Sequence, residues 1–247
     1  MINLKDIVEA RFEGNPAVIE KLPKYRIKEI NKYKKLKIKE LEDSLKSIFK
    51  IIRNGDNVFW LRWVIDFRGR LYCHSKLGPH GGDFSKGIIR FKEWKILGES
   101  GWKWVKVYVC NLLSGIDLVD FFKMESVNLS WDFDKNKNKE SFDSRAEWTE
   151  NHIDSILFIS ETLRNIFDKK DVGISDDSKE NLLKLMGICV EDLIKPKTEI
   201  FQRLAAILEM ERLVIEYRQK LNWNKIKSGL PIHFDASCNG FQHAAAL

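Results

Sequence analysis

Residues 230–247 read LPIHFDASCNGFQHAAAL and join a short apolar run to a single acid, Asp235. Alternation of apolar and polar residues predicts a strand that places His233 and Asp235 on one face, opposite the apolar side chains. Ala236 and other small residues follow the acid, so no bulky neighbour shields its carboxylate. The pattern predicts an aspartate at a strand end, ahead of a turn and the start of a helix.

Two roles for Asp235 fit this pattern. Mg²⁺ favours one or two carboxylates completed by substrate phosphates and water, so Asp235 and the backbone carbonyl of Ala236 are suited to form half of a magnesium site. A strand-end aspartate also commonly caps the helix that follows it. The spacing of His233 and His243 around this acid matches no zinc motif, so a transition-metal cluster is not favoured.

A second segment whose residue types are suited to ligand binding, DFRGR, begins at Asp66. Gly69 would let the backbone approach a ligand closely, and the guanidinium groups of Arg68 and Arg70 are suited to phosphate. If the segment is extended, both arginines lie on one side, and Asp66 orients one of them through a charge-assisted hydrogen bond. Lys86, in the glycine-rich stretch downstream, adds positive charge. The alternative is an Asp–Arg pair that only fixes a turn.

Helical patterns account for most of the remaining chain. Between residues 41 and 52, apolar residues are spaced at 4, 3 and 4, the stripe of an amphipathic helix. Gly55 is suited to the left-handed position after that helix. Another long helix is expected from about 197 to 221, with apolar residues on more than one side, so it should pack between neighbours. We expect a helix-rich α+β fold with a small, incomplete antiparallel sheet.

Three local expectations can be compared directly with the structure. Residues 58–72 read VFWLRWVIDFRGRLY, which is typical of an extended, well-buried segment. Ser144 and Glu147 have the spacing of a capping box at the start of a helix. The tryptophans at positions 60, 63, 94, 102 and 104 are expected in the core rather than at a surface that stacks on bases.

Composition and charge limit the classes of function. The chain has 247 residues, a formal net charge of +6 and a pI near 9.0, which permit a polyanionic partner without requiring one. Residues 21–39 are strongly basic, with Glu29 as their only acid; a solvated helix face is the usual explanation and a phosphate-facing surface the alternative. No apolar run is long enough to span a bilayer. The four cysteines contain no CxxC pair, so neither a zinc ribbon nor a disulfide scaffold is indicated.

The two motifs, in this order, resemble those of the single-subunit DNA-dependent RNA polymerases of bacteriophages and mitochondria, including polymerases carried on mitochondrial linear plasmids. DFRGRLYCHSKLGPHGGDFSKG is similar to that family's DxxGR-x-Y region and the stretch after it, and LPIHFDASCNGFQH to its palm motif A. GWKWVKVYVCNLLSG and RAEWTENHIDSI also look like family segments. The likeness runs across most of the chain from about residue 40.

The resemblance implies a role for each matching residue of the first palm strand. It implies that Asp235 is the catalytic aspartate and holds both catalytic Mg²⁺ ions, with the Ala236 carbonyl joining in; Ala236 stands where the family has glycine, which a carbonyl role tolerates. The implied reaction is attack of an RNA 3′-hydroxyl on the α-phosphate of a ribonucleoside triphosphate. The implied partners are a DNA template, the RNA product and ribonucleoside triphosphates, with no membrane, and the implied location is the mitochondrion.

The resemblance also implies roles in the upstream element. Arg68, Arg70 and Lys86 would contact nucleic acid, while Asp66 and Gly69 would shape and orient the turn. Gly78 replaces the asparagine of the family pattern, with no evident consequence. The implied organisation is a basic helical N-terminal segment, 1–56, and a partial palm-type polymerase catalytic domain, 57–247, covering the approach from thumb to palm.

A two-metal site needs a second carboxylate, which in this family comes from a later His-Asp-Asp hairpin. The 247 residues contain no HDD and no fingers motif R-x₃-K followed by Tyr-Gly. We expect a fragment of a longer polymerase, or a truncated reading frame, that is inactive alone and has the missing C-terminal portion as a partner. The alternatives are a non-catalytic nucleic-acid-binding remnant that uses the basic helix and the two arginines, and an inert pseudogene product.

Overall fold

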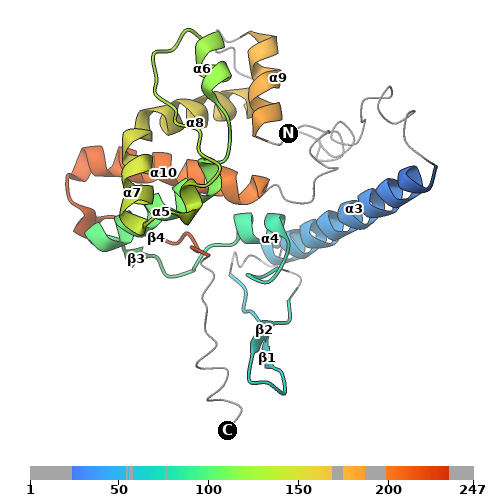
Figure 1. Cartoon of the computed structure of the whole chain (residues 1–247). Coiled ribbons are helices and arrows are strands. Elements are labelled where there is room, and N and C mark those ends of the chain that lie inside the picture. The colour runs from blue at the N-terminus through green and yellow to red at the C-terminus, as the bar shows by residue number, and fades with distance from the viewer. Residues whose placement is uncertain are drawn as a thin grey trace.

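A computed structural model describes residues 24–53, 55, 58–75, 77–168, 175–186 and 199–233 (Figure 1). The described chain is helix-rich and contains two small antiparallel sheets. The predicted α+β class is therefore confirmed. None of the helices in these ranges has both the length and the apolar character needed to cross a lipid bilayer.

Four helices form the main body of the structure. They are α5 (Gly98–Leu113), α7 (Phe142–Asn151), α8 (Ile153–Phe167) and α10 (Ile200–Lys220). α10 packs against α5, α8 and the short helix α4 (Asp83–Ile88), so the expectation that this helix lies between neighbours is confirmed. Its N-terminus is at Ile200 rather than 197. The fully buried side chains at the centre come from α5, α8 and α10: Val105, Val109, Leu113, Ile156, Ile159, Ile207, Met210 and Leu213.

Two further helices, α6 (Val119–Met124) and α9 (Asp176–Leu185), lie side by side at one end of the body (Figure 1). Phe121 of α6 and Leu182 of α9 are fully buried and join the same core. Two short 3₁₀ helices, Lys137–Lys139 and Trp223–Lys225, complete the helical elements of the described ranges.

The sheets are both two-stranded. β1 (Trp63–Ile65) pairs with β2 (Leu71–Cys73), in the register Trp63↔Cys73, Val64↔Tyr72, Ile65↔Leu71. β3 (Lys95–Ile96) pairs with β4 (Lys227–Ser228) across more than a hundred residues of sequence. This second pair brings the middle of the chain beside the segment that leads to Asp235.

The long helix α3 (Lys24–Arg53) projects from the body as an arm (Figure 1). Gly55 follows it with a φ of +79°, and its amide donates to the Ile52 carbonyl at 3.1 Å, which confirms the predicted left-handed ending. The apolar stripe is only partly covered, because Ile52 is 53% exposed.

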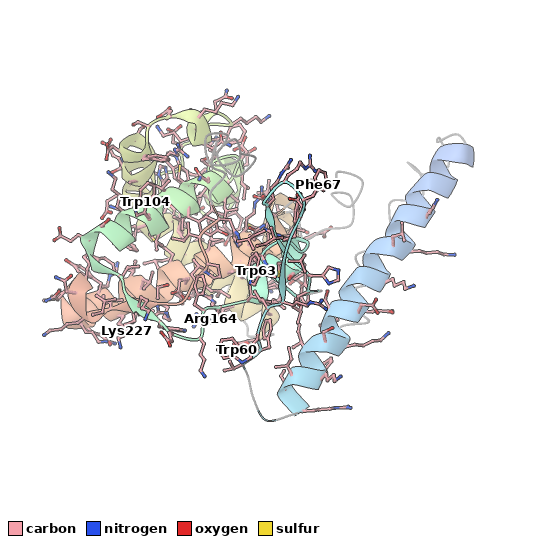
Figure 2. The ribbon with its side chains drawn as sticks, turned by 90° about the horizontal axis from the view of Figure 1, so that it is seen from below. Trp60, Trp63, Phe67, Trp104, Arg164 and Lys227 are labelled. Carbon is pink, nitrogen blue, oxygen red and sulfur yellow. The ribbon has the colours of Figure 1, made fainter. Side chains whose placement is uncertain are left out.

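The aromatic side chains around the hairpin contradict the sequence expectation. The segment 58–72 forms an exposed hairpin rather than a buried strand, and only Trp102 among the five tryptophans is buried. Trp60 is 89% exposed. For Trp60 and Trp63, the reason is that β1 and β2 form a sheet of two strands without a third strand among the described residues. Figure 2 shows Trp60, Trp63 and Phe67 spaced along this segment.

The predicted capping box is also wrong by one turn. The N-cap of α7 is Ser141, whose hydroxyl accepts a hydrogen bond from the Ser144 amide at 3.2 Å. The helix thus begins at Phe142, and Ser144 lies inside its first turn. Both positions are serine, so both can cap a helix. The spacing between Ser144 and Glu147 was therefore not enough to identify the N-cap residue.

His152, at the junction of α7 and α8, is buried as a neutral ring. Its Nδ1 donates to the Trp148 carbonyl at 2.5 Å, and its Nε2 accepts from the Asp132 amide at 2.9 Å. The ring also stacks on Trp148, with centroids 4.4 Å apart. Burial, together with the positive charge of Lys137, lowers the pKa of His152 against the opposing effects of the Trp148 carbonyl and Asp132.

This environment predicts a pH-dependent stability. Because the unfolded chain binds a proton at a higher pH than the folded chain, the contribution of His152 is complete above its ordinary pKa near 6.5. It declines as the pH falls below that value toward the lowered pKa of the folded chain. Urea unfolding at about pH 7.5 and about pH 5.5 should show a smaller loss of stability in His152→Gln than in wild type. The exposed His74, changed to Gln, is the control. Equal losses in wild type and His152→Gln would contradict the prediction.

Candidate functional site

The DFRGR segment forms the turn of the β1–β2 hairpin. Asp66 organises this turn: its Oδ1 accepts from the amides of Arg68 and Arg70, each at 2.9 Å, and its carbonyl accepts from the Gly69 amide at 3.0 Å. Gly69 has a φ of +74°, which favours glycine. The backbone hydrogen bond from Arg70, followed by that from Arg68 and the charges of both arginines, lowers the pKa of Asp66 although burial opposes it.

This geometry corrects the expectation of an extended segment with both arginines on one side. The interpretation of an Asp–Arg turn is confirmed, since Asp66 Oδ2 lies 3.6 Å from Arg68 Nε. The Arg68 guanidinium also lies 5.1 Å from the ring centre of Phe67, which is 93% exposed. Arg70 forms no hydrogen bond or ion pair through its guanidinium within the described residues. A phosphate-binding role for either arginine stays a prediction.

The hairpin is tied to the segment after it through His80. The Cys73 amide donates to His80 Nδ1 at 2.9 Å, and the His80 ring meets Trp63 edge-on at 5.5 Å between centroids. The segment then turns at Gly78, whose amide donates to Ser85 Oγ at 2.7 Å. These contacts connect the arginine-bearing turn to α4, the helix that carries Lys86. The predicted glycine-rich loop thus ends at Gly82 and continues as a helix.

α4 is in turn anchored to α10. Asp83 Oδ2 accepts from the Phe201 amide at 2.8 Å, and Asp83 Oδ1 accepts from the Gln202 amide at 3.2 Å and from Gln202 Nε2 at 3.1 Å. Phe84 and Phe201 meet edge-on with centroids 4.8 Å apart. A Cβ on Gly87 would lie 2.5 Å from the Phe201 carbonyl group, so only glycine allows this approach.

The segment before Asp235 is held by residues 91–97. The Phe91 amide donates to the Gly229 carbonyl, and the Leu97 amide to the Ile226 carbonyl, both at 2.8 Å. Gly229 packs against Trp94 so closely that a Cβ would lie 2.5 Å from the ring. Strand pairing ends at Ser228, so the predicted strand is absent over Pro231–His233. Phe234, Asp235 and Ala236 lie outside the described residues, and the alternation there is not tested.

A buried ionic network fixes this segment to α10. Glu209 is 3% exposed, and its carboxylate accepts from Arg90 at 2.9 Å, from Arg212 at 2.7 and 3.2 Å, and from Ser228 at 2.6 Å. Burial acts to raise the pKa of Glu209, but the hydrogen bonds from Arg212 and Ser228 and the charge of Arg90 together lower it. The Arg212 guanidinium also donates to the Lys227 carbonyl and lies 4.7 Å from the ring centre of Trp94.

His233 is the last described residue of the C-terminal segment and lies two positions before Asp235 in the sequence. Its Nε2 is buried without a hydrogen-bond partner among the described residues. Burial lowers the pKa of His233, and the positive charge of Lys86 lowers it further.

Sequence reasoning missed three of these residues: Asp83, Ser85 and Glu209. Two of them lie in the stretch that follows DFRGR, so their proximity to that motif was an available signal. Their partners were not visible, because Asp83 binds amides 118 and 119 positions away and Glu209 binds Arg90 119 positions away.

The donor chemistry of Asp235 and Ala236 fits a hard cation, because a carboxylate and a backbone carbonyl are oxygen ligands of the kind Mg²⁺ prefers. Within the described ranges, no group of three or more His, Cys, Asp or Glu side chains is placed to hold a metal ion. The described residues therefore offer no alternative metal centre.

Comparison with known proteins identifies the family. Residues 95–247 match the family model of DNA-dependent RNA polymerase. The chain is 31% identical over 190 residues to the mitochondrial DNA-directed RNA polymerase 1 of Arabidopsis thaliana, with 76% of this chain and 14% of that protein covered. It is 30% identical over 184 residues to the chloroplastic/mitochondrial DNA-directed RNA polymerase 2 of Nicotiana sylvestris, with 74% and 13% covered.

A third relative, the chloroplastic DNA-directed RNA polymerase 3 of Nicotiana sylvestris, is 27% identical over 252 aligned residues, which cover 100% of this chain and 21% of that protein. This alignment includes the hairpin as well as the segment of Asp235. The chain spans about a fifth or less of the length of these relatives. The chain belongs to the single-subunit DNA-dependent RNA polymerase family of the phage and organelle type.

Proposed function

We propose that this chain is part of a DNA-directed RNA polymerase that transfers nucleotides from ribonucleoside triphosphates to a growing RNA, and that it acts in mitochondrial transcription. The observation that carries the proposal is the family match over residues 95–247, which contains Asp235. The organelle names of its relatives support an organellar location: one is mitochondrial, one is chloroplastic/mitochondrial and one is chloroplastic.

In this proposal, Asp235 and the Ala236 carbonyl hold Mg²⁺, which when bound activates the attacking hydroxyl and stabilises the departing pyrophosphate. Arg68, Arg70 and Lys86 contact the template or the RNA–DNA hybrid through phosphate. The positions of these cations support the assignment: the arginines lie on an exposed turn, and that turn is linked through His80 to the helix that carries Lys86.

We also propose that the 247 residues are catalytically incomplete on their own. The resemblance supplies one metal-binding carboxylate within them, and one carboxylate does not position two magnesium ions. The missing carboxylate and the nucleotide-gripping residues would come from another portion of a polymerase.

Nucleic-acid contact can be tested on the purified chain. Binding to an RNA–DNA hybrid should weaken with salt, and each phosphate contact contributes about 0.7 to 0.9 to the slope of log affinity against log salt. Arg70→Ala and Lys86→Ala should each lower that slope by about one contact. Arg218→Ala is the matched control, since Arg218 is exposed at the far end of α10 and pairs with Asp154. Unchanged slopes in both test variants would refute the assignment.

A further inference from the structure

Asp83 caps the N-terminus of a helix to which it does not belong. Glu199 is the N-cap residue of α10, yet its side chain makes no capping hydrogen bond. The amides of Phe201 and Gln202, which have no partner within their own helix, instead donate to the Asp83 carboxylate from α4. Asp83 of α4 thus caps the N-terminus of α10.

The same carboxylate reaches further into the core through Gln202. Gln202 Nε2 donates to Asp83 Oδ1, while Gln202 Oε1 accepts from the Tyr108 hydroxyl of α5 at 3.4 Å. Burial, followed by the negative charges of Glu199 and Asp83, raises the pKa of Tyr108, so this hydroxyl keeps its proton and remains a donor. Asp83 therefore connects α4 to two long helices of the body.

α4 depends on such anchors for its orientation. It has six residues, too few to form a stable helix without tertiary contacts. Asp83 lies in its first turn and Lys86 in its last, three positions later, so both side chains project from one side of α4. A rotation of α4 that released Asp83 would therefore also displace Lys86.

We propose that Asp83 is a positioning residue that holds Lys86 on the nucleic-acid path by fixing α4 to the N-terminus of α10. The inference rests on the proposed function for the role of Lys86 and adds a residue to which neither the sequence motifs nor the family match assign a task. Asp83 contacts no nucleic acid in this account; it acts through Lys86.

The test is the salt dependence of RNA–DNA hybrid binding by the purified chain. Removing an acid near a phosphate-binding surface should by simple electrostatics strengthen binding. The positioning role gives the opposite sign: Asp83→Ala should weaken binding and lower the salt slope by about one phosphate contact, as Lys86→Ala does. In the Lys86→Ala background, Asp83→Ala should lower the slope no further.

Two variants separate positioning from loss of charge. Asp83→Asn removes the charge but keeps a carbonyl oxygen that accepts from helix amides, so it should restore most of the wild-type slope. Asp120→Ala is the matched control, because Asp120 is an exposed acid in the first turn of another six-residue helix, α6. It should leave the slope at the wild-type value. Amide exchange should quicken at Phe201 and Gln202 in Asp83→Ala while the amides of α5 keep their protection, which rules out global unfolding.

The outcomes are distinguishable. A wild-type slope in Asp83→Ala, a further fall in the Lys86→Ala background, or Asp83→Asn behaving like Asp83→Ala would overturn the positioning role while leaving the proposed function intact. If Lys86→Ala keeps the wild-type slope, the role of Lys86 and that of Asp83 both fail, whereas Arg70 can still bind. If the wild-type chain shows no salt-dependent binding, the proposed nucleic-acid function itself fails.

Discussion

Glu209→Ala is expected to destabilise the fold by about 3 kcal/mol, because it leaves two arginines without the buried carboxylate that they share. Arg90 and Arg212 would lose three charge-assisted hydrogen bonds between them, and Ser228 would lose its acceptor. Each arginine side chain is about a third exposed, so water partly replaces the lost carboxylate and the cost lies at the lower end of the range for such groups.

The measurement is urea unfolding of the purified chain near neutral pH, followed by circular dichroism. Glu161→Ala is the control, since Glu161 is an exposed glutamate in the middle of α8 and should change stability by no more than about 0.5 kcal/mol. A loss below about 1 kcal/mol in Glu209→Ala would show that the network contributes little. A large loss would establish that α10 holds the β4 segment in place on the approach to Asp235.

The sequence predicted the elements whose causes are local. The helix that ends before Gly55 is encoded by a continuous apolar spacing and a glycine that adopts a positive φ. The long helix α10 is likewise specified by its own residues, and only its first turn was misplaced. In each of these cases the information lies within a few turns of the element itself.

The misses arise where tertiary contacts decide. Trp60 and Trp63 have the hydrophobic character of core residues, but their hairpin has no third strand among the described residues and leaves them exposed. The sequence predicts an extended DFRGR segment, whereas two hydrogen bonds from backbone amides to the Asp66 carboxylate fold it into a turn. The Asp66 carboxylate, which was expected to orient an arginine side chain, also accepts hydrogen bonds from two backbone amides.

The candidate site likewise combines features that the sequence predicts with features that depend on tertiary contacts. Its motifs were recognisable from residue types and order, because charge and glycine content are local properties. The connections between them were not, since Asp83 reaches α10 and Glu209 reaches Arg90 over more than a hundred positions. Polar side chains reveal their partners only when the fold brings the segments together.

Asp235→Asn is expected to have the largest effect on activity. A carboxylate that holds catalytic metal contributes several kcal/mol of transition-state stabilisation, and about 4 kcal/mol corresponds to roughly a thousandfold in rate. The purified chain is expected to incorporate no ribonucleotide by itself. The effect is therefore measured in a chimera in which this chain replaces the matching segment of the Arabidopsis mitochondrial polymerase.

The assay is template-dependent incorporation of labelled ribonucleotides by that chimera, compared with its Asp235→Asn variant. Asp177→Asn serves as the matched control, because Asp177 is an exposed acid in α9, distant in sequence from both motifs. We predict an active chimera, an equally active Asp177→Asn variant, and a loss of about a thousandfold in Asp235→Asn. An active chimera that keeps its full rate with asparagine at this position would contradict the assignment of Asp235 as the metal-holding residue of a polymerase.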